Sequence, residues 1–183
     1  MSGAGHVDTS HKGIALLIAM LALVLAFSET LGKAAQTAAL SANIEAANLW
    51  NFYQAKTVRM TTLRTAAEAA ELQAGAAAPE AVGKQTEAWR KTAARYDSEP
   101  ETGEGRKELM ARAKQAEARR DRSMAAYHQY EIASGSVQIA IVLASATIIT
   151  GIAALAWISG GLGVLGVVFS LIGLFAPNAV HLF

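Results

Sequence analysis

Three long apolar runs frame a polar middle section of this 183-residue chain. The runs are Gly13 to Leu31, Val137 to Trp157 and Leu162 to Ala176, and none contains Lys, Arg or Asp. A bilayer crossing needs about 20 residues at a rise of ~1.5 Å each, so the first two runs are long enough. The third is shorter unless residues 179–183 extend it past Pro177, so it either crosses or re-enters. We therefore expect two or three transmembrane helices.

The middle section has the composition of helices. Strong helix formers dominate from Leu31 to Ala74, and only Gly32 weakens the pattern. Pro79 suits the first turn of a second helix, and the acidic, breaker-rich stretch Asp97 to Gly105 predicts a loop before a third. The first helix and the two later ones would span matching lengths of roughly 66 and 70 Å. We expect an all-α integral membrane protein whose soluble part is a long, coiled-coil-like antiparallel hairpin.

The pattern gives the following expected organisation. Residues 1–12 form a flexible tail, and residues 13–31 form the first transmembrane helix. The hairpin domain covers 32–134, with helices at about 32–74, 79–96 and 106–134. The second transmembrane helix covers 135–157, the glycine-rich Gly160 to Gly166 begins with a turn, and 162–180 forms a third transmembrane helix or re-entrant segment.

Bulky rings alternate with alanine along the predicted hairpin. Counting outward from the membrane places the aromatic group near residue 50 level with Ala111, Ala113, Ala116 and Ala118. Rings on one helix that face alanine on the other fill the space between helices and let the backbones approach. Similar counting pairs the rings near residue 128 with Ala34, Ala35, Ala38 and Ala39, and Trp89 with Ala66, Ala67 and Ala70. The expected packing residues are Trp50, Phe52, Tyr53, Trp89, Tyr127 and Tyr130.

Charge and composition bear on location. The chain is 52% hydrophobic but only 7% aromatic, which is too apolar and alanine-rich for an ordinary soluble domain. Of sixteen Lys and Arg, fifteen lie between Lys33 and Arg122, which places the middle domain on the cytoplasmic side. The sequence has no cysteine, so disulfides and thiolate sites are excluded.

Few residues suggest chemistry. The polar residues Glu29, Gln36 and Gln138 lie near the ends of apolar runs, where they could make a polar contact between helices or line a pore.

The basic residues Arg119, Arg120 and Arg122 could contact lipid headgroups, although a solvated helix surface with intrahelical pairs is the simpler interpretation. Residues 32–132 carry fifteen cations against thirteen anions, which argues against nucleic acid as a partner. His6, Asp8 and His11 are interpreted as part of a solvated tail, and we expect no metal, cofactor or catalytic residue.

Two stretches resemble a known family. "ANLWNFYQAKTVR" at Ala47 to Arg59 and "HQYEIASGSVQIAIVLASATIIT" at His128 to Thr150 are similar to the bacterial membrane proteins of domain-of-unknown-function family 4337. The similarity extends over nearly the whole chain. It implies a bacterial inner-membrane location, and the family carries no established activity, cofactor or substrate.

These features favour a non-enzymatic, homo-oligomeric scaffold or adaptor, because a lone pair of long helices exposes alanine and apolar surface that self-association would bury. The alternative is an oligomeric channel or transport-related pore with Glu29 or Gln138 near its mouth. Expected partners are the lipid bilayer, further copies of the chain and an unidentified protein held by the hairpin.

Overall fold

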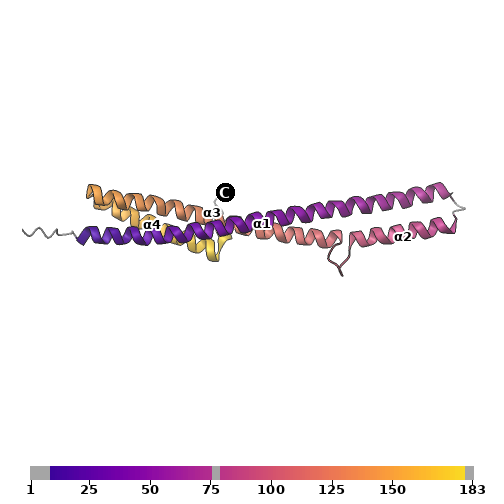
Figure 1. Cartoon of the computed structure of the whole chain (residues 1–183), viewed down its shortest axis with the longest axis horizontal. Coiled ribbons are helices and arrows are strands. Elements are labelled where there is room, and N and C mark those ends of the chain that lie inside the picture. Colours follow the sequence, from indigo (N-terminus) through magenta and orange to yellow (C-terminus); the bar gives the residue numbers. More distant parts are fainter. Residues whose placement is uncertain (1–8, 76–78, 180–183) are drawn as a thin grey trace, which may run out of the picture. The chain divides into compact units, whose positions relative to one another are not determined.

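The protein is all-α over the part of the chain described. A computed structural model describes residues 9–75 and 79–179, among which there is no strand (Figure 1). The helices are α1 (Thr9–Ala74), α2 (Glu80–Asp97), α3 (Arg106–Thr150) and α4 (Ala153–Phe175), followed by the short 3-10 helix η2 (Pro177–Ala179). The predicted fold class is therefore confirmed at the level of helices. Most of the expected tail, residues 1–8, lies outside the described residues, but α1 already begins at Thr9 rather than Gly13, since no proline interrupts the residues between them.

The contacts divide the chain into two units, which we call the apolar unit and the polar unit. The apolar unit comprises Met1–Leu40 with Asp121–Phe183, and the polar unit comprises Ser41–Arg120. The division lies inside the expected hairpin domain of residues 32–134. One reason is that Tyr130 contacts Gly32 of α1 and Gly173 of α4, so this part of α3 belongs with the apolar helices.

Within the described part of the chain, three helices, α1, α3 and α4, are long and apolar enough to cross a membrane. In the apolar unit a buried cluster of Leu21, Val137 and Ala140 joins α1 to α3. The buried residues of α4 are all small: Ser159, Gly163, Gly166 and Gly173. Small residues let helix backbones approach closely where no hydrophobic force drives association, which is the usual basis of packing in lipid.

The turn between α3 and α4 corrects the sequence prediction. We expected the second apolar helix to continue to Trp157 and a turn to begin at Gly160, but α3 ends at Thr150 and α4 runs unbroken through Gly160. The turn falls at Gly151, whose φ of 71° is favourable only for glycine and whose N–H donates to the Thr147 carbonyl at 2.9 Å. As a result α4 is not a short segment but a helix of 23 residues, which is ~35 Å long. It ends at Phe175, just before Pro177, rather than at residue 180.

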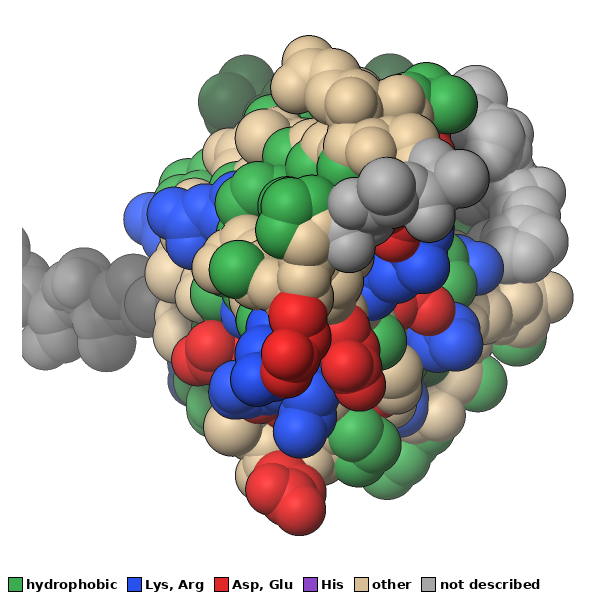
Figure 2. Space-filling view, turned by 90° about the vertical axis from the view of Figure 1, so that its right-hand side faces the viewer, with side chains coloured by type: hydrophobic (Ala, Val, Ile, Leu, Met, Phe, Trp, Pro, Cys, Tyr) green, Lys and Arg blue, Asp and Glu red, His purple; other side chains and the backbone are tan. Residues whose placement is uncertain are grey.

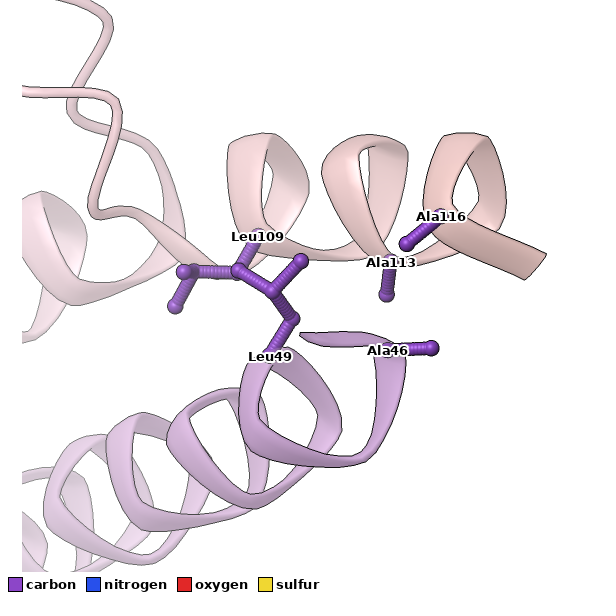
Figure 3. Close-up of a cluster of buried hydrophobic side chains, with 5 residues drawn as sticks. All are labelled: Ala46, Leu49, Leu109, Ala113 and Ala116. Carbon is purple, nitrogen blue, oxygen red and sulfur yellow. The ribbon is translucent and has the colours of Figure 1, made fainter. Parts of the chain in front are cut away.

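The polar unit has its core between α1 and the first turns of α3. Leu49 and Leu109 point toward one another from these two helices (Figure 3). Alanines complete the cluster, and Leu109 is fully buried. The expected pairing of large with small side chains is present here, since the rings near residue 50 lie against a cluster that contains Ala113 and Ala116.

Candidate functional site

The rings of Trp50, Phe52 and Tyr53 all lie against the core cluster, and all three are only partly buried. The Trp50 indole Nε1 donates to Glu117 Oε1 at 2.9 Å, and its ring meets that of Tyr53 edge-on at 5.4 Å. Tyr53 in turn accepts a hydrogen bond from Arg106 Nη2 at 2.9 Å. The polar ends of these rings are thus used to join α1 to α3, which hydrophobic spacing alone could not indicate.

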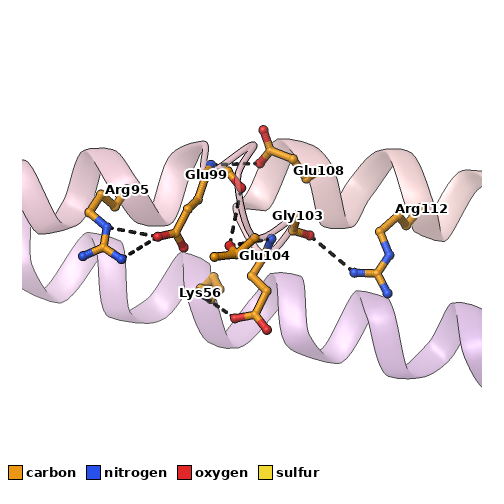
Figure 4. Close-up of polar contacts among 8 residues, drawn as sticks. Lys56, Arg95, Glu99, Gly103, Glu104, Glu108 and Arg112 are labelled. Atoms are coloured by element: carbon orange, nitrogen blue, oxygen red, sulfur yellow. Dashed lines mark hydrogen bonds and ion pairs between the residues drawn. The ribbon is translucent and has the colours of Figure 1, made fainter.

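Lys56 is the most buried cation of the polar unit, with 6% of its surface exposed. Its Nζ lies 5.3 Å from the centre of the Phe52 ring and 5.0 Å from that of Tyr96. The Glu104 carboxylate lies 3.9 Å from it (Figure 4). Two aromatic faces and one carboxylate compensate for the lost hydration of the ammonium, so the site is structural in character.

The acidic loop between α2 and α3 is held by a carboxylate of its own and by one in the first turn of α3 (Figure 4). Glu108 accepts hydrogen bonds from the Ser98 hydroxyl at 2.7 Å and from the backbone N–H of Glu99 at 3.2 Å. The Ser98 bond is the main cause that holds the pKa of the Glu108 carboxyl below its usual value. Hydrogen bonds from Arg95 similarly lower the pKa of Glu99. A Cβ at Gly105 would overlap the Glu108 carboxylate, which leaves glycine as the residue that fits.

Trp89 lies where α2 meets α1 in the polar unit. It is partly buried and lines an open depression of about 260 Å³ together with Ala70, one of its expected neighbours. Arg90 pairs with Glu71 across the same two helices at 2.7 Å.

Figure 2, which faces the right-hand end of Figure 1, shows Lys and Arg side chains intermixed with Asp and Glu. No large surface of one sign is visible on this face.

Tyr130 has different neighbours from those expected. It is 4% exposed, and its contacts include Gly32 of α1 and Gly173 of α4 rather than only the alanines at residues 34–39. The expectation considered two helices, whereas Tyr130 contacts a third, because its ring lies against Gly173 of α4, where only glycine leaves room for it. Tyr127 is partly exposed, and its hydroxyl donates to Glu131 at 2.7 Å.

A polar pocket of about 350 Å³ lies between α1 and α3 in the apolar unit. Two of the three residues singled out as polar membrane contacts, Glu29 and Gln36, line it, and the third, Gln138, donates to Glu29 at 3.3 Å. We call it the interfacial pocket. Its lining residues are Ser28, Glu29, Gly32, Lys33, Gln36, Tyr127, Tyr130, Glu131 and Ser134.

The basic run of α3 contacts α1 rather than standing free. Arg119 pairs with Glu45 at 2.5 Å, and Arg120 donates to Asn43 at 3.5 Å. Arg122 is exposed. It precedes Gln138 by sixteen residues of continuous helix, or ~24 Å. Arg122 is therefore far from the apolar run, whereas the interfacial pocket lies next to it. The pocket is the better placed of the two for contact with lipid headgroups.

One face of α1 in the polar unit carries no charge although each of its residues is exposed. Its residues follow one another at alternating steps of four and three, the spacing of a coiled-coil seam. Ile44, Val58 and Leu72 are 53%, 65% and 84% exposed, and an open groove of about 630 Å³ runs beside Val58. The sequence prediction missed this face, although its 3–4 alternation could have revealed it. We call it the α1 stripe, and it consists of Ile44, Asn48, Asn51, Ala55, Val58, Thr62, Thr65, Ala69 and Leu72.

Among the described residues no group of three or more His, Asp or Glu is placed to hold a metal ion. His6 and Asp8 of the N-terminal trio lie outside the described residues, and His11 lies on α1.

Comparison with known proteins identifies a family. The model of a family described as "Domain of unknown function (DUF4337)" matches residues 10–176, which is most of the chain. No curated protein and no solved structure matches significantly.

Proposed function

We propose that this chain, which belongs to the DUF4337 family, is a non-enzymatic, homo-oligomeric membrane scaffold. Its α1 and α2–α3 segments form the two arms of an antiparallel helical hairpin anchored by the apolar unit. In the bacterial inner membrane the positive-inside rule would place the polar unit in the cytoplasm, because fifteen of the sixteen Lys and Arg lie from Lys33 to Arg122. A reporter that is active only in the cytoplasm is therefore expected to be active when it is fused at Gly103, in the loop between α2 and α3.

The observation that carries the proposal is the α1 stripe. Copies anchored in one membrane with the same orientation would pair their α1 helices in parallel. Each residue near the axis of such a pair faces the same residue of the other copy, so a charge there would meet a like charge. The six charged residues of α1 within the polar unit all lie off the stripe: Glu45, Lys56, Arg59, Arg64, Glu68 and Glu71.

The stripe favours a second copy over solvent for two reasons. Its exposed large side chains recur at intervals of fourteen residues, Ile44, Val58 and Leu72, so they would bury one another in register. Its polar residues are uncharged Asn and Thr, which can hydrogen-bond across a seam and fix its register at some cost in stability. Anchoring in a membrane also raises the effective concentration of the copies, so a weak seam suffices.

Cysteine crosslinking tests the proposal cleanly because the natural chain has no cysteine. Thr65→Cys places a thiol on the stripe, and Arg64→Cys places one on the adjacent residue, ~100° away around the helix. In membranes under mild oxidation, Thr65→Cys and Val58→Cys are expected to give disulfide-linked dimers, whereas Arg64→Cys is expected to stay monomeric. Equal crosslinking at residues 64 and 65, or none at 58 and 65, would contradict pairing through the stripe.

Contacts in the apolar unit favour the scaffold over a conduction path. The hydroxyl groups of α4 are used within the chain, since Ser170 bonds to Ser28 at 2.8 Å and Ser159 donates to the Ala140 carbonyl at 2.7 Å. A pore lining needs polar groups that face water. Recordings from the purified protein in planar bilayers are expected to show no unitary current, and currents abolished by Glu29→Ala would support the channel instead.

A further inference from the structure

The interfacial pocket lies where two apolar runs end. On α1 it begins at Ser28 and Glu29, at the end of the run that starts at Gly13, and on α3 it ends at Ser134, just before the run that starts at Val137. Polar residues therefore line the pocket, while the next turns of both helices are apolar. In a bilayer this level is occupied by lipid headgroups, with acyl chains against the apolar turns.

The charges in the pocket are mixed rather than of one sign. Glu29 and Glu131 contribute two carboxylates and Lys33 one ammonium, which gives a formal charge of −1. Glu131 is held in place by the Tyr127 hydroxyl at 2.7 Å and by His128 Nδ1 at 3.3 Å. Lys33 is exposed and makes no ion pair with any residue that the structure describes, so its ammonium is available to an anion.

This arrangement complements a group that carries an ammonium next to a phosphate. A primary ammonium has three N–H donors for the two carboxylates, and the phosphate oxygens accept from Lys33. The Ser134 hydroxyl, which lines the pocket as well, donates to the Glu131 carbonyl, and its oxygen can accept a further hydrogen bond. We propose that the interfacial pocket binds the headgroup of a phospholipid with a primary ammonium, as in phosphatidylethanolamine.

The chemistry separates this lipid from other phospholipids. Phosphatidylcholine has the same charges, but its quaternary ammonium has no N–H to donate. Phosphatidylglycerol offers a phosphate and hydroxyl groups but no cation, and the two carboxylates repel its net charge. The pocket thus selects for an ammonium that carries N–H donors.

Native mass spectrometry of the full chain in detergent tests this selection. The protein is mixed with equal amounts of phosphatidylethanolamine, phosphatidylcholine and phosphatidylglycerol that have matched acyl chains. We expect the ethanolamine lipid to be bound about tenfold more than either competitor, the effect of a single charge-assisted hydrogen bond. Equal uptake of the three lipids, or a preference for phosphatidylglycerol, would overturn the proposal.

Variants locate the selection in the pocket. Glu131→Gln and Lys33→Gln are expected to remove most of the preference, and Lys33→Arg is expected to retain it. Both residues are exposed, so the variants are expected to keep their helix content. Glu45→Gln is the matched control, because Glu45 lies on α1 like Lys33 but in the polar unit, away from the pocket. This variant is expected to leave the preference unchanged. An unaltered preference in Glu131→Gln would overturn the site, and equally strong displacement by soluble phosphoethanolamine would overturn a lipid as its occupant.

Discussion

The close packing of α4 predicts opposite effects for one substitution at two glycines. At Gly166 a Cβ would overlap Val137 Cγ2 and lie 3.1 Å from the Ala133 carbonyl oxygen. Val137 is fully buried, so neither side of the site can readily give way. At Gly161, five residues earlier on the same helix, a Cβ would meet nothing within 4 Å.

The expected magnitudes follow from these surroundings. Overpacking a tight site costs about 1–3 kcal/mol, and replacing a helical glycine by alanine returns up to ~1 kcal/mol. Gly166→Ala is therefore expected to destabilise the apolar unit by roughly 1–2 kcal/mol, whereas Gly161→Ala is expected to stabilise it by ~0.5–1 kcal/mol. Both free energies can be measured by unfolding in mixed micelles, with helix content followed by circular dichroism.

A double variant identifies the cause. Val137→Ala removes the methyl group that the new Cβ would strike, so Gly166→Ala is expected to cost less in that background than in the natural chain. The reasoning is refuted if Gly166→Ala is as stable as Gly161→Ala, because the α4 contact would then not be close enough to require glycine.

Three further predictions concern single side chains. Leu109→Ala, at a fully buried site, is expected to destabilise the polar unit by about 2–5 kcal/mol in thermal unfolding, and a loss below ~1 kcal/mol would show that the cluster is not a tight core. The folded-state pKa of Glu108 lies below its ordinary value (~4.3 for a free glutamate), so its stabilisation is present above that value and is lost as pH falls through the folded pKa. Glu108→Gln should thus lower stability at pH 7 and flatten the acid dependence, whereas an unchanged pH profile would assign that dependence to other carboxylates. Gly151→Ala is expected to cost about 1–2 kcal/mol in unfolding because its φ is 71°, and a neutral effect would mean that the turn can relax.

The helices were predictable because their signals are local. Helix formers without proline specify α1 between Leu31 and Ala74, and α2 spans Glu80–Asp97 where residues 79–96 were expected. The turn after α3 was missed because seven glycine and apolar residues at 160–166 suggest a break more strongly than Gly151 alone. Glycine has two opposite uses, and only the packing of α4 on its neighbours decides that the later glycines serve helix contact.

The candidate sites were predictable in part for the same reason. Spacing along two helices placed the rings near residue 50 beside Ala113 and Ala116, and it suggested the contact between Glu29 and Gln138. The neighbours of Tyr130 depend on where a third helix packs, which periodicity does not specify. The hydrogen bonds of Trp50 to Glu117 and of Tyr53 to Arg106 also depend on how each helix is rotated about its axis. Counting residues along the sequence does not determine this rotation.

The Gly151–Ile152 connection has a consequence for how the protein is made. Only these two residues separate α3 from α4, so the two helices have no independent polar segment between them. A translocation channel would receive them as one joined pair, and neither could be released into lipid far ahead of the other. Lengthening this link with a flexible polar insert should uncouple the two insertion steps and allow α4 to remain outside the bilayer in some of the newly made chains.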